Sequence, residues 1–258
     1  MKFDASIRTE DEIEELKSIG SIMKDMWRNS FFHTLKGKSG KDVALFIENF
    51  LSQYSISTIK NFIIDGKRYK HSLCISYNDI LVHGFPTEEK FDEKKISAVR
   101  IDVIGFRNGM YIDSARTFLL NEKDEKYKYL IEVGNKIMQM LQSTIKVGNK
   151  VSDITKLVDK ISSSSNVYLV PFLGGHSIGC LLHLPPFIPN RMKDMKAIFN
   201  LEIKHNSVFA IEPLLSDKKT EIKVEQQWLI KAIPNDVRVV HVENTYLFTN
   251  ENNMESLT

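Results

Sequence analysis

Two aspartates interrupt apolar, strand-like segments, and they restrict what this chain can fold into. Asp102 lies within VRIDVI at 99–104, and Asp113 lies within MYIDSA at 110–115. Aspartate is a poor strand former, and burying a carboxylate is costly unless the charge is paired or binds a metal. Two such residues on neighbouring strands therefore predict a cation site.

The turn between these strands predicts how the two carboxylates are arranged. Arg107-Asn108-Gly109 is a favourable hairpin turn. A hairpin that is symmetric about the 107/108 bond places Asp102 directly opposite Asp113, with Cβ atoms about 4.5–5.5 Å apart. Like charges at that separation repel unless a cation or proton is shared. The alternative is two aspartates that form unrelated salt bridges.

Composition limits the class of protein but does not define a function. The chain has 258 residues, 42% hydrophobic and 26% charged, with a formal net charge of +2. Its charges are mixed along the sequence, which does not favour nucleic-acid binding. The segment MKFDASIR at 1–8 lacks a signal-peptide core, and no apolar run is long enough for a membrane span. Cys74 and Cys180 are expected as free thiols in a reducing compartment, so we expect a cytoplasmic protein.

Hydrophobic periodicity predicts two similar halves. Thr9 and Glu12 form a capping box ahead of a helix, and apolar residues at helical spacing predict further helices around 43–51, 127–141 and 151–161. DVALFIE at 42–48 aligns with DITKLVD at 153–159, which suggests internal duplication, although two amphipathic helices can look alike by chance. Strands are predicted at about 73–76, 80–83, 98–106, 110–119, 207–213, 222–231 and 237–248. With no regular strand–helix alternation, this pattern favours an α+β fold with antiparallel sheets.

Three further residues extend the candidate cation site. His176 lies in the tight segment GGHSIG at 174–179, while Glu212 and Glu243 again place acids inside apolar strand-like segments. Together with Asp102 and Asp113 they provide four carboxylates and one imidazole, which balance two divalent cations. Oxygen-rich sites with one nitrogen suit Mn, Fe, Co or Zn in a bridged pair. A thiolate zinc site is excluded because the two cysteines lack the required spacing.

Two more histidines accompany this set. His83 ends a strand-like segment before Gly-Phe-Pro, and His183 precedes Leu-Pro-Pro. Either could be an ordinary loop histidine, or an imidazole that contacts a substrate.

Taken in order, these seven residues resemble the methionine aminopeptidases of the pita-bread metallopeptidase superfamily, and the length resembles the short type I enzymes. The resemblance extends from about residue 7 to residue 250, includes SLCISYND at 72–79, and implies one catalytic domain over 1–258. It implies a pita-bread fold, in which pseudo-two-fold duplicated halves form a curved antiparallel sheet covered by helices. Three positions and one segment depart from the family pattern: Ile104, Leu184, Asn244 and FIPN at 187–190. These lie around the ligands and are expected to tune metal affinity and rate.

The resemblance also implies a mechanism. Asp113 and Glu243 would bridge two divalent ions (Co, Mn, Fe or Zn), Asp102 would complete one ion, and His176 with Glu212 would complete the other. A bridging water would attack the peptide carbonyl, with Glu212 as the proton shuttle. His83 and His183 would hydrogen-bond the substrate. The methionine pocket is expected to be lined by Tyr69, Cys74, Leu182 and Trp228.

The implied activity is removal of the N-terminal methionine from newly made proteins. The expected partners are nascent polypeptide N-termini, with the ribosome as a meeting place. Neither nucleic acid nor membrane is expected as a partner, and the chain is expected to be a monomer. The alternatives are an Xaa-Pro-type peptidase of the same superfamily, or a catalytically altered binding module.

Overall fold

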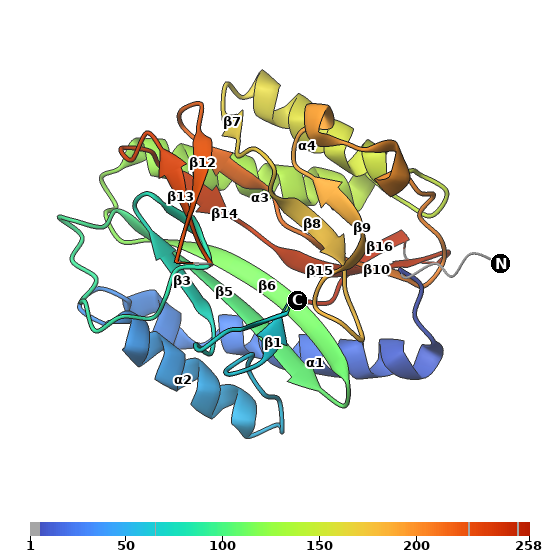
Figure 1. Ribbon diagram of the computed structural model, residues 1–258, viewed down its shortest axis with the longest axis horizontal. Helices are drawn as coiled ribbons and strands as arrows, with labels where there is room; N and C mark the ends of the chain where they lie inside the picture. The colour runs from blue at the N-terminus through green and yellow to red at the C-terminus, as the bar shows by residue number, and fades with distance from the viewer. Residues whose placement is uncertain (1–5, 65, 227, 252) are drawn as a thin grey trace.

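Two pairs of helices enclose the strands from opposite sides (Figure 1). The structure is a computed structural model, and it describes residues 6–258 apart from 65, 227 and 252. The α-helices are α1 (Glu10–Trp27), α2 (Gly40–Ser52), α3 (Glu125–Thr144) and α4 (Val151–Ser164). Short 3₁₀ helices are η1 (Ser30–Thr34), η2 (Met192–Asp194) and η3 (Ala197–Phe199). Helices α1 and α2 lie at the bottom of Figure 1, and α3 and α4 lie at the top.

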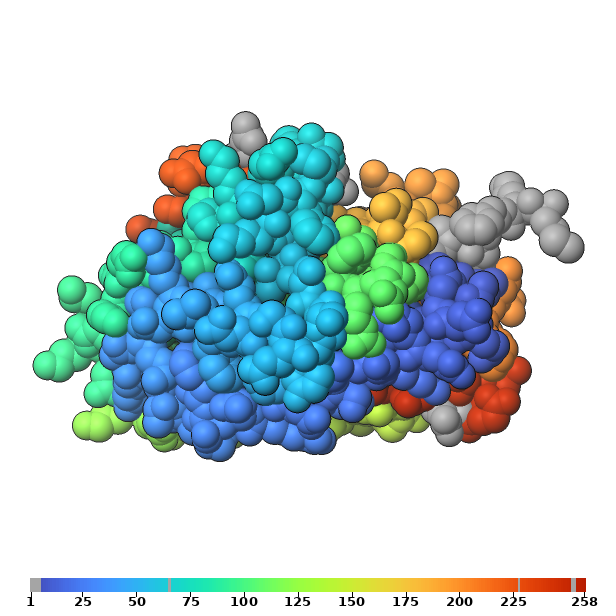
Figure 2. All heavy atoms as spheres, turned by 90° about the horizontal axis from the view of Figure 1, so that it is seen from below, coloured from blue at the N-terminus to red at the C-terminus, as the bar shows by residue number. Residues whose placement is uncertain are grey.

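All four predicted helices are present, and their apolar faces are buried as expected. The Thr9–Glu12 capping box is formed at the start of α1, which buries Ile13, Leu16 and Ile19 on one face. Figure 2 shows that α1 and α2, in blue, cover one face of the molecule. An apolar stripe at helical spacing must be covered by another element, which is why α1, α3 and α4 pack on strands and α2 packs on α1.

The strands form several small antiparallel sheets. One sheet contains β3 (Cys74–Tyr77), β5 (Ala98–Arg107) and β6 (Met110–Leu119) in that order. A second has the order β16 (Asn253–Ser256), β15 (Asn244–Thr249), β10 (Ser207–Ile211), β8 (Gly174–Ser177) and β9 (Leu184–Pro189). A third contains β14 (Val239–His241), β11 (Leu214–Ser216) and β7 (Tyr168–Leu169), and a fourth contains β12 (Glu221–Glu225), β13 (Leu229–Ile233) and β4 (Ile80–Val82). The two short strands β1 (Ile63–Ile64) and β2 (Lys67–Arg68) pair with each other.

Each helix pair has its own hydrophobic core. The first core joins α1 and α2 to β3, β5 and β6, and the second joins α3 and α4 to β10, β14 and β15. Both cores are built from apolar helix stripes packed on sheet faces. This confirms the predicted α+β architecture of two comparable halves with helices covering antiparallel strands.

The β5–β6 register differs from the prediction. Arg107 pairs with Met110, so the turn is the two-residue loop Asn108–Gly109, in which both residues have positive φ (48° and 81°). Asp113 consequently pairs with Ile104, and Asp102 pairs with Ala115, so the prediction that the two aspartates are directly opposite was wrong. Asn-Gly readily adopts this tight turn, which moves the hairpin centre by one residue. Because Asp102 and Ile104 lie two positions apart, the two carboxylates still share one face as diagonal neighbours.

Three predicted strands are interrupted. The segment predicted at 207–213 leaves its sheet after Ile211, and the segment predicted at 237–248 is broken at 242–243. The segment predicted at 222–231 is instead the hairpin β12–β13, with residue 227 outside the described part. Seven strands were not predicted: β1, β2, β7, β8, β9, β11 and β16. Of these, β8 and β9 contain several Gly and Pro residues, which are depleted in strands.

Further expectations concern the thiols and membrane association. Cys74 is buried and Cys180 is exposed, and both are free, as predicted. Among the helices that the structure describes, none is sufficiently long and apolar to cross a lipid bilayer. Residues 1–5 of the segment considered for a signal peptide lie outside the described residues.

Candidate metal centre

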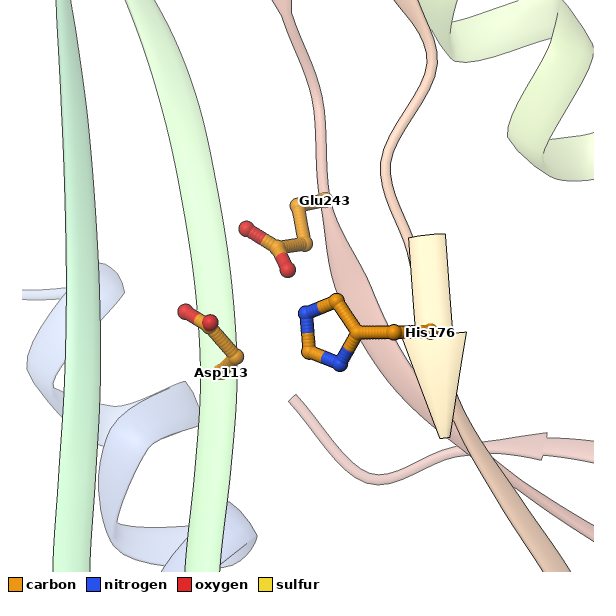
Figure 3. A group of neighbouring side chains, drawn as sticks. All are labelled: Asp113, His176 and Glu243. Carbon is orange, nitrogen blue, oxygen red and sulfur yellow. The ribbon is translucent and has the colours of Figure 1, made fainter. Parts of the chain in front are cut away.

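The predicted ligands converge between the two halves of the molecule. Asp113 is on β6, His176 is on β8, and Glu243 is in the break between β14 and β15. Figure 3 shows their three side chains pointing toward one another, and one potential ligand atom from each lies within 4.8 Å of the others. All three residues are buried. Asp102 and Glu212 line the same narrow cavity, so the structure brings all five predicted ligands together.

The second half of the site is hydrogen-bonded directly to β6. The Glu243 backbone N–H donates to the Ala115 carbonyl at 3.0 Å, and Thr245 Oγ1 donates to the Asp113 carbonyl at 2.8 Å. On the other side of the break, Thr117 Oγ1 donates to the His241 carbonyl at 2.7 Å. These bonds explain why the strand is broken at Glu243: its backbone partner is β6, and its carboxylate is directed into the site.

Two glycines allow His176 to reach the site. A Cβ on Gly174 would lie 2.2 Å from the Ile188 carbonyl oxygen, and a Cβ on Gly175 would lie 2.2 Å from that of Ala210. Strand β8 therefore passes between β9 and β10 at a spacing that only glycine permits. The Nδ1 of His176 lies 3.0 Å from the Ser177 carbonyl, which can only accept. Because Nδ1 then carries the proton, the neutral ring directs an unprotonated Nε2 into the site, as a metal ligand requires.

The four carboxylates destabilise one another's ionised forms. Burial raises the pKa of Asp113 well above its usual range, and the charges of Asp102 and Glu212 raise it further. Burial also raises the pKa values of Glu212 and Glu243, with added repulsion from neighbouring acids. Burial raises the pKa of Asp102 as well. Such a cluster is unfavourable at neutral pH unless protons or cations compensate its charge.

Three buried carboxylate oxygens without hydrogen-bond partners in the described part of the chain show that a cation would fit this site. Asp102 Oδ1, Asp113 Oδ1 and Glu243 Oε1 have no hydrogen-bond partner among the described residues. Buried polar atoms are nearly always paired, so three orphaned carboxylate oxygens facing one cavity indicate missing positive charge. The donor set of carboxylates and one imidazole suits a divalent transition metal.

A residue that sequence reasoning missed lies beside the cluster. His241 Nε2 is 3.6 Å from Glu212 Oε2 and 3.7 Å from Glu243 Oε2. Burial lowers the pKa of His241 to about 4, so the ring is neutral at physiological pH. The signal was available in VVHVEN at 239–244, where a histidine interrupts an apolar strand two residues before a predicted ligand.

Two of the family departures are explained by their contacts. Asn244 accepts a hydrogen bond from Arg116 at 2.7 Å and donates to the Tyr246 hydroxyl at 3.1 Å. Arg116 also bonds the Glu243 carbonyl, so Asn244 helps to fix the backbone that carries Glu243. Ile104, the strand partner of Asp113, lines the narrow cavity.

The narrow cavity contains every residue predicted for the site. Its volume is about 50 Å³, and its apolar end is formed by Ile59, Ile64, Tyr69, Cys74, Leu182 and Trp228. The Tyr69 hydroxyl is tied to the Leu73 carbonyl at 3.1 Å and lies 3.2 Å from Cys74 Sγ. Burial raises the pKa of Cys74, so its thiol stays neutral and adds no charge to the apolar part of the cavity. Ile59 and Ile64 were not predicted from sequence.

The two accessory histidines stand where this cavity meets a wider one. His83 and His183 line both cavities, together with His176 and Glu212. The Nδ1 of His83 lies 3.2 Å from the Trp228 carbonyl, and the residue has a positive φ of 59°. The ring of His183 meets that of His176 edge-on at 4.7 Å. Both imidazoles can therefore face a molecule that extends from one cavity to the other.

Comparisons with known proteins agree with the predicted resemblance. The profile of metallopeptidase family M24 matches residues 14–250. A methionine aminopeptidase of Aquifex aeolicus is 33% identical over 184 residues, or 70% of each chain. The mitochondrial methionine aminopeptidase 1D of Mus musculus is 30% identical over 183 residues, 70% of this chain but only 52% of that relative. A crystal structure of a methionine aminopeptidase from Thermotoga maritima superposes with a TM-score of 0.87 at 27% identity, covering 98% of both chains.

Proposed function

This chain belongs to metallopeptidase family M24, and we propose that it removes the N-terminal methionine from newly made proteins. The observation that carries the proposal is the convergence of four carboxylates and His176 on one narrow cavity that is otherwise lined mainly by apolar residues. Relatives and solved structures named methionine aminopeptidase support the same activity.

Membership of the family implies the use of a divalent metal, and we propose that two ions bind. Asp113 and Glu243 would each contact both ions, Asp102 would complete one, and His176 with Glu212 would complete the other. The orphaned oxygens of Asp102, Asp113 and Glu243 support this assignment. The ions are Mn, Fe, Co or Zn, and when bound they would lower the pKa of water and polarise the substrate carbonyl.

Glu212 is proposed to move the proton. Among the four proposed carboxylate ligands, Glu212 is the one that lines both cavities, and its side chain is 16% exposed, so it can reach both water and a leaving amine. A carboxylate that reaches both can take a proton from one and pass it to the other.

His83 and His183 are proposed to bind the peptide group. Their position where the two cavities meet is where the peptide bond lies when the first side chain fills the narrow cavity. Imidazole N–H groups there would donate to the carbonyl oxygen as it gains negative charge. Tyr69, Cys74, Leu182 and Trp228 would contact the methionine side chain, since a narrow uncharged slot suits an unbranched thioether.

We further propose the setting in which this reaction occurs. The substrates would be nascent chains in the cytoplasm, met as they leave the ribosome, and the chain would act as a monomer without binding nucleic acid or membranes. The two free thiols suit a reducing compartment. The net charge of +2 is too small to favour a polyanion as a partner.

Peptide hydrolysis tests the proposal. Mn²⁺-loaded protein should release methionine from Met-Ala-Ser-Ser and leave Ala-Pro-Ser-Ser and Leu-Ala-Ser-Ser intact, as measured by chromatography of the products. Cleavage of the Xaa-Pro peptide alone would favour the related peptidase activity. Binding of metal without hydrolysis of any of the three would favour a binding module.

A further inference from the structure

A wide apolar pocket adjoins the narrow cavity. Its volume is about 420 Å³, and its walls include Phe172, Leu173, Leu184, Pro185, Phe187 and Phe199. Among its lining residues in the described part of the chain, the titratable ones are His83, His176, His183 and Glu212, which it shares with the narrow cavity. The two cavities therefore adjoin at the proposed reacting groups.

The position of the wide pocket beside the narrow cavity determines what it can hold, given the proposed function. The narrow cavity takes the first side chain, and the peptide bond to be cut lies at the shared wall. The rest of the substrate must then leave through the wide pocket. An extended chain advances about 3.3 Å per residue, so the second residue is still close to the shared imidazoles. The third residue is the first whose side chain lies beyond them, among the apolar walls.

Phe172 is held at the rim of this pocket in an unusual conformation. Its side chain is 66% exposed although it is large and apolar, and its φ is 60°, a region that bulky residues rarely adopt. Asp194 accepts the Phe172 backbone N–H at 3.2 Å and forms a bidentate ion pair with Arg191. The Arg191 guanidinium lies 5.5 Å from the centre of the Phe172 ring. Backbone strain of this kind persists where surrounding contacts enforce it, often at ligand sites.

Other residues that line this pocket are also apolar. Phe187 and Phe199 meet edge-on with ring centres 6.0 Å apart. Leu184 occupies a position where methionine aminopeptidases usually have glutamate, so the pocket wall carries no negative charge at that position. A pocket with aromatic walls and no charge beyond the reacting groups favours an apolar side chain.

We propose that this pocket binds the substrate downstream of the cut bond and selects a large apolar side chain at its third residue. The inference rests on the proposed function and extends it to the sequence of the substrate. Phe172 is a specificity-determining residue in this account.

Matched pentapeptides test the inference. Met-Ala-Phe-Ser-Ser should be cleaved with a kcat/KM about tenfold above that of Met-Ala-Ser-Ser-Ser, as expected for partial burial of an apolar group. Met-Ala-Ser-Ser-Phe, with the same composition as the first peptide, should behave like the second. Equal rates for all three peptides, or the same gain from phenylalanine at position five, would overturn the inference and leave the proposed function intact. Failure to cleave any of them would refute both.

A variant pair locates the effect. Phe172→Asn should reduce the position-three preference at least threefold with no loss of melting temperature, because asparagine tolerates positive φ. Ile198→Asn changes a neighbouring apolar residue that is 73% exposed and does not line the pocket, so its preference should match the original protein. An unchanged preference in Phe172→Asn would contradict the assignment of Phe172.

Discussion

The two halves of the molecule present their carboxylates to the metal centre in different ways. In the first half, Asp102 and Asp113 lie within ten-residue strands whose pairing is continuous. In the second half, Glu212 and Glu243 lie where strands leave one sheet and enter another. Residues inside a strand are directed by side-chain alternation, whereas residues at a break are directed by the contacts that hold the break.

The consequence is a division of structural roles. The first half forms a rigid face, and the second half attaches to it through Glu243–Ala115, Thr245–Asp113 and His241–Thr117 hydrogen bonds. The candidate metal centre lies at this junction, because one of the two proposed bridging acids, Asp113 and Glu243, comes from each half. The comparison therefore predicts equal dependence on both halves for metal binding, but unequal sensitivity to changes around the ligands.

Removing one proposed bridging charge from either half should have the largest effect. Asp113→Asn and Glu243→Gln should each lower kcat/KM for Met-Ala-Ser-Ser by about 10³-fold or more. This loss exceeds the roughly 10–100-fold loss of activity that is typical when a residue hydrogen-bonded to a metal ligand is changed. Elemental analysis should show loss of bound Mn²⁺ in both variants. Asp236→Asn, an exposed acid paired with Lys218, is the matched control and should be unaffected. Full activity in one variant alone would mean that the halves do not share the ions.

His241 should have an intermediate effect, confined to the second half. His241→Leu should weaken Mn²⁺ binding about 10–100-fold by calorimetry, because it removes a buried neutral imidazole whose Nε2 lies 3.6 Å from Glu212 and 3.7 Å from Glu243. His241→Gln keeps an N–H donor and should recover part of the affinity. Similar losses in Leu and Gln variants would show that His241 contributes only packing.

The smallest expected effect is a pH-dependent gain of stability on metal binding. Without metal, the pKa values of Asp113, Glu212 and Glu243 are raised, so the stability they contribute is present at low pH and lost as pH rises through the folded-state values. His241, with a pKa lowered to about 4, contributes constantly above its unfolded value near 6.5. The difference in melting temperature between Mn²⁺-loaded and chelated protein should therefore widen as the pH rises above the ordinary carboxyl range. Each kcal/mol added to the free energy of unfolding should raise the melting temperature by about 2–4 °C. A difference that narrows as the pH rises would contradict the assigned shifts.

The same contrast explains what sequence could predict. The acids in apolar segments pointed to the candidate ligands that the structure brings to one cavity, since a carboxylate in a buried strand needs compensating charge. The helix caps and apolar stripes identified all four α-helices, because those signals are local. The predicted centre of the β5–β6 hairpin was wrong by one residue, so that Asp102 pairs with Ala115 instead of Asp113. The prediction did not use the positive-φ preference of both Asn108 and Gly109.

The second half was harder to predict because its determinants are distant in sequence. Nothing near Glu243 signals that its backbone will bond Ala115 on β6, so 237–248 was predicted as one strand. Gly174 and Gly175 disfavour a strand locally, yet β8 forms because only glycine fits between the flanking strands. His241 was overlooked for a related reason: its importance comes from lying between two acids that the broken strands bring together.

Anomalous diffraction from crystals soaked in Mn²⁺ would test the shared centre most directly. The account predicts two peaks about 3.5–4 Å apart, both in contact with Asp113 and Glu243, one also held by Asp102 and the other by His176 and Glu212. Peaks that contact carboxylates of only one half, or the absence of a peak at this junction, would contradict it.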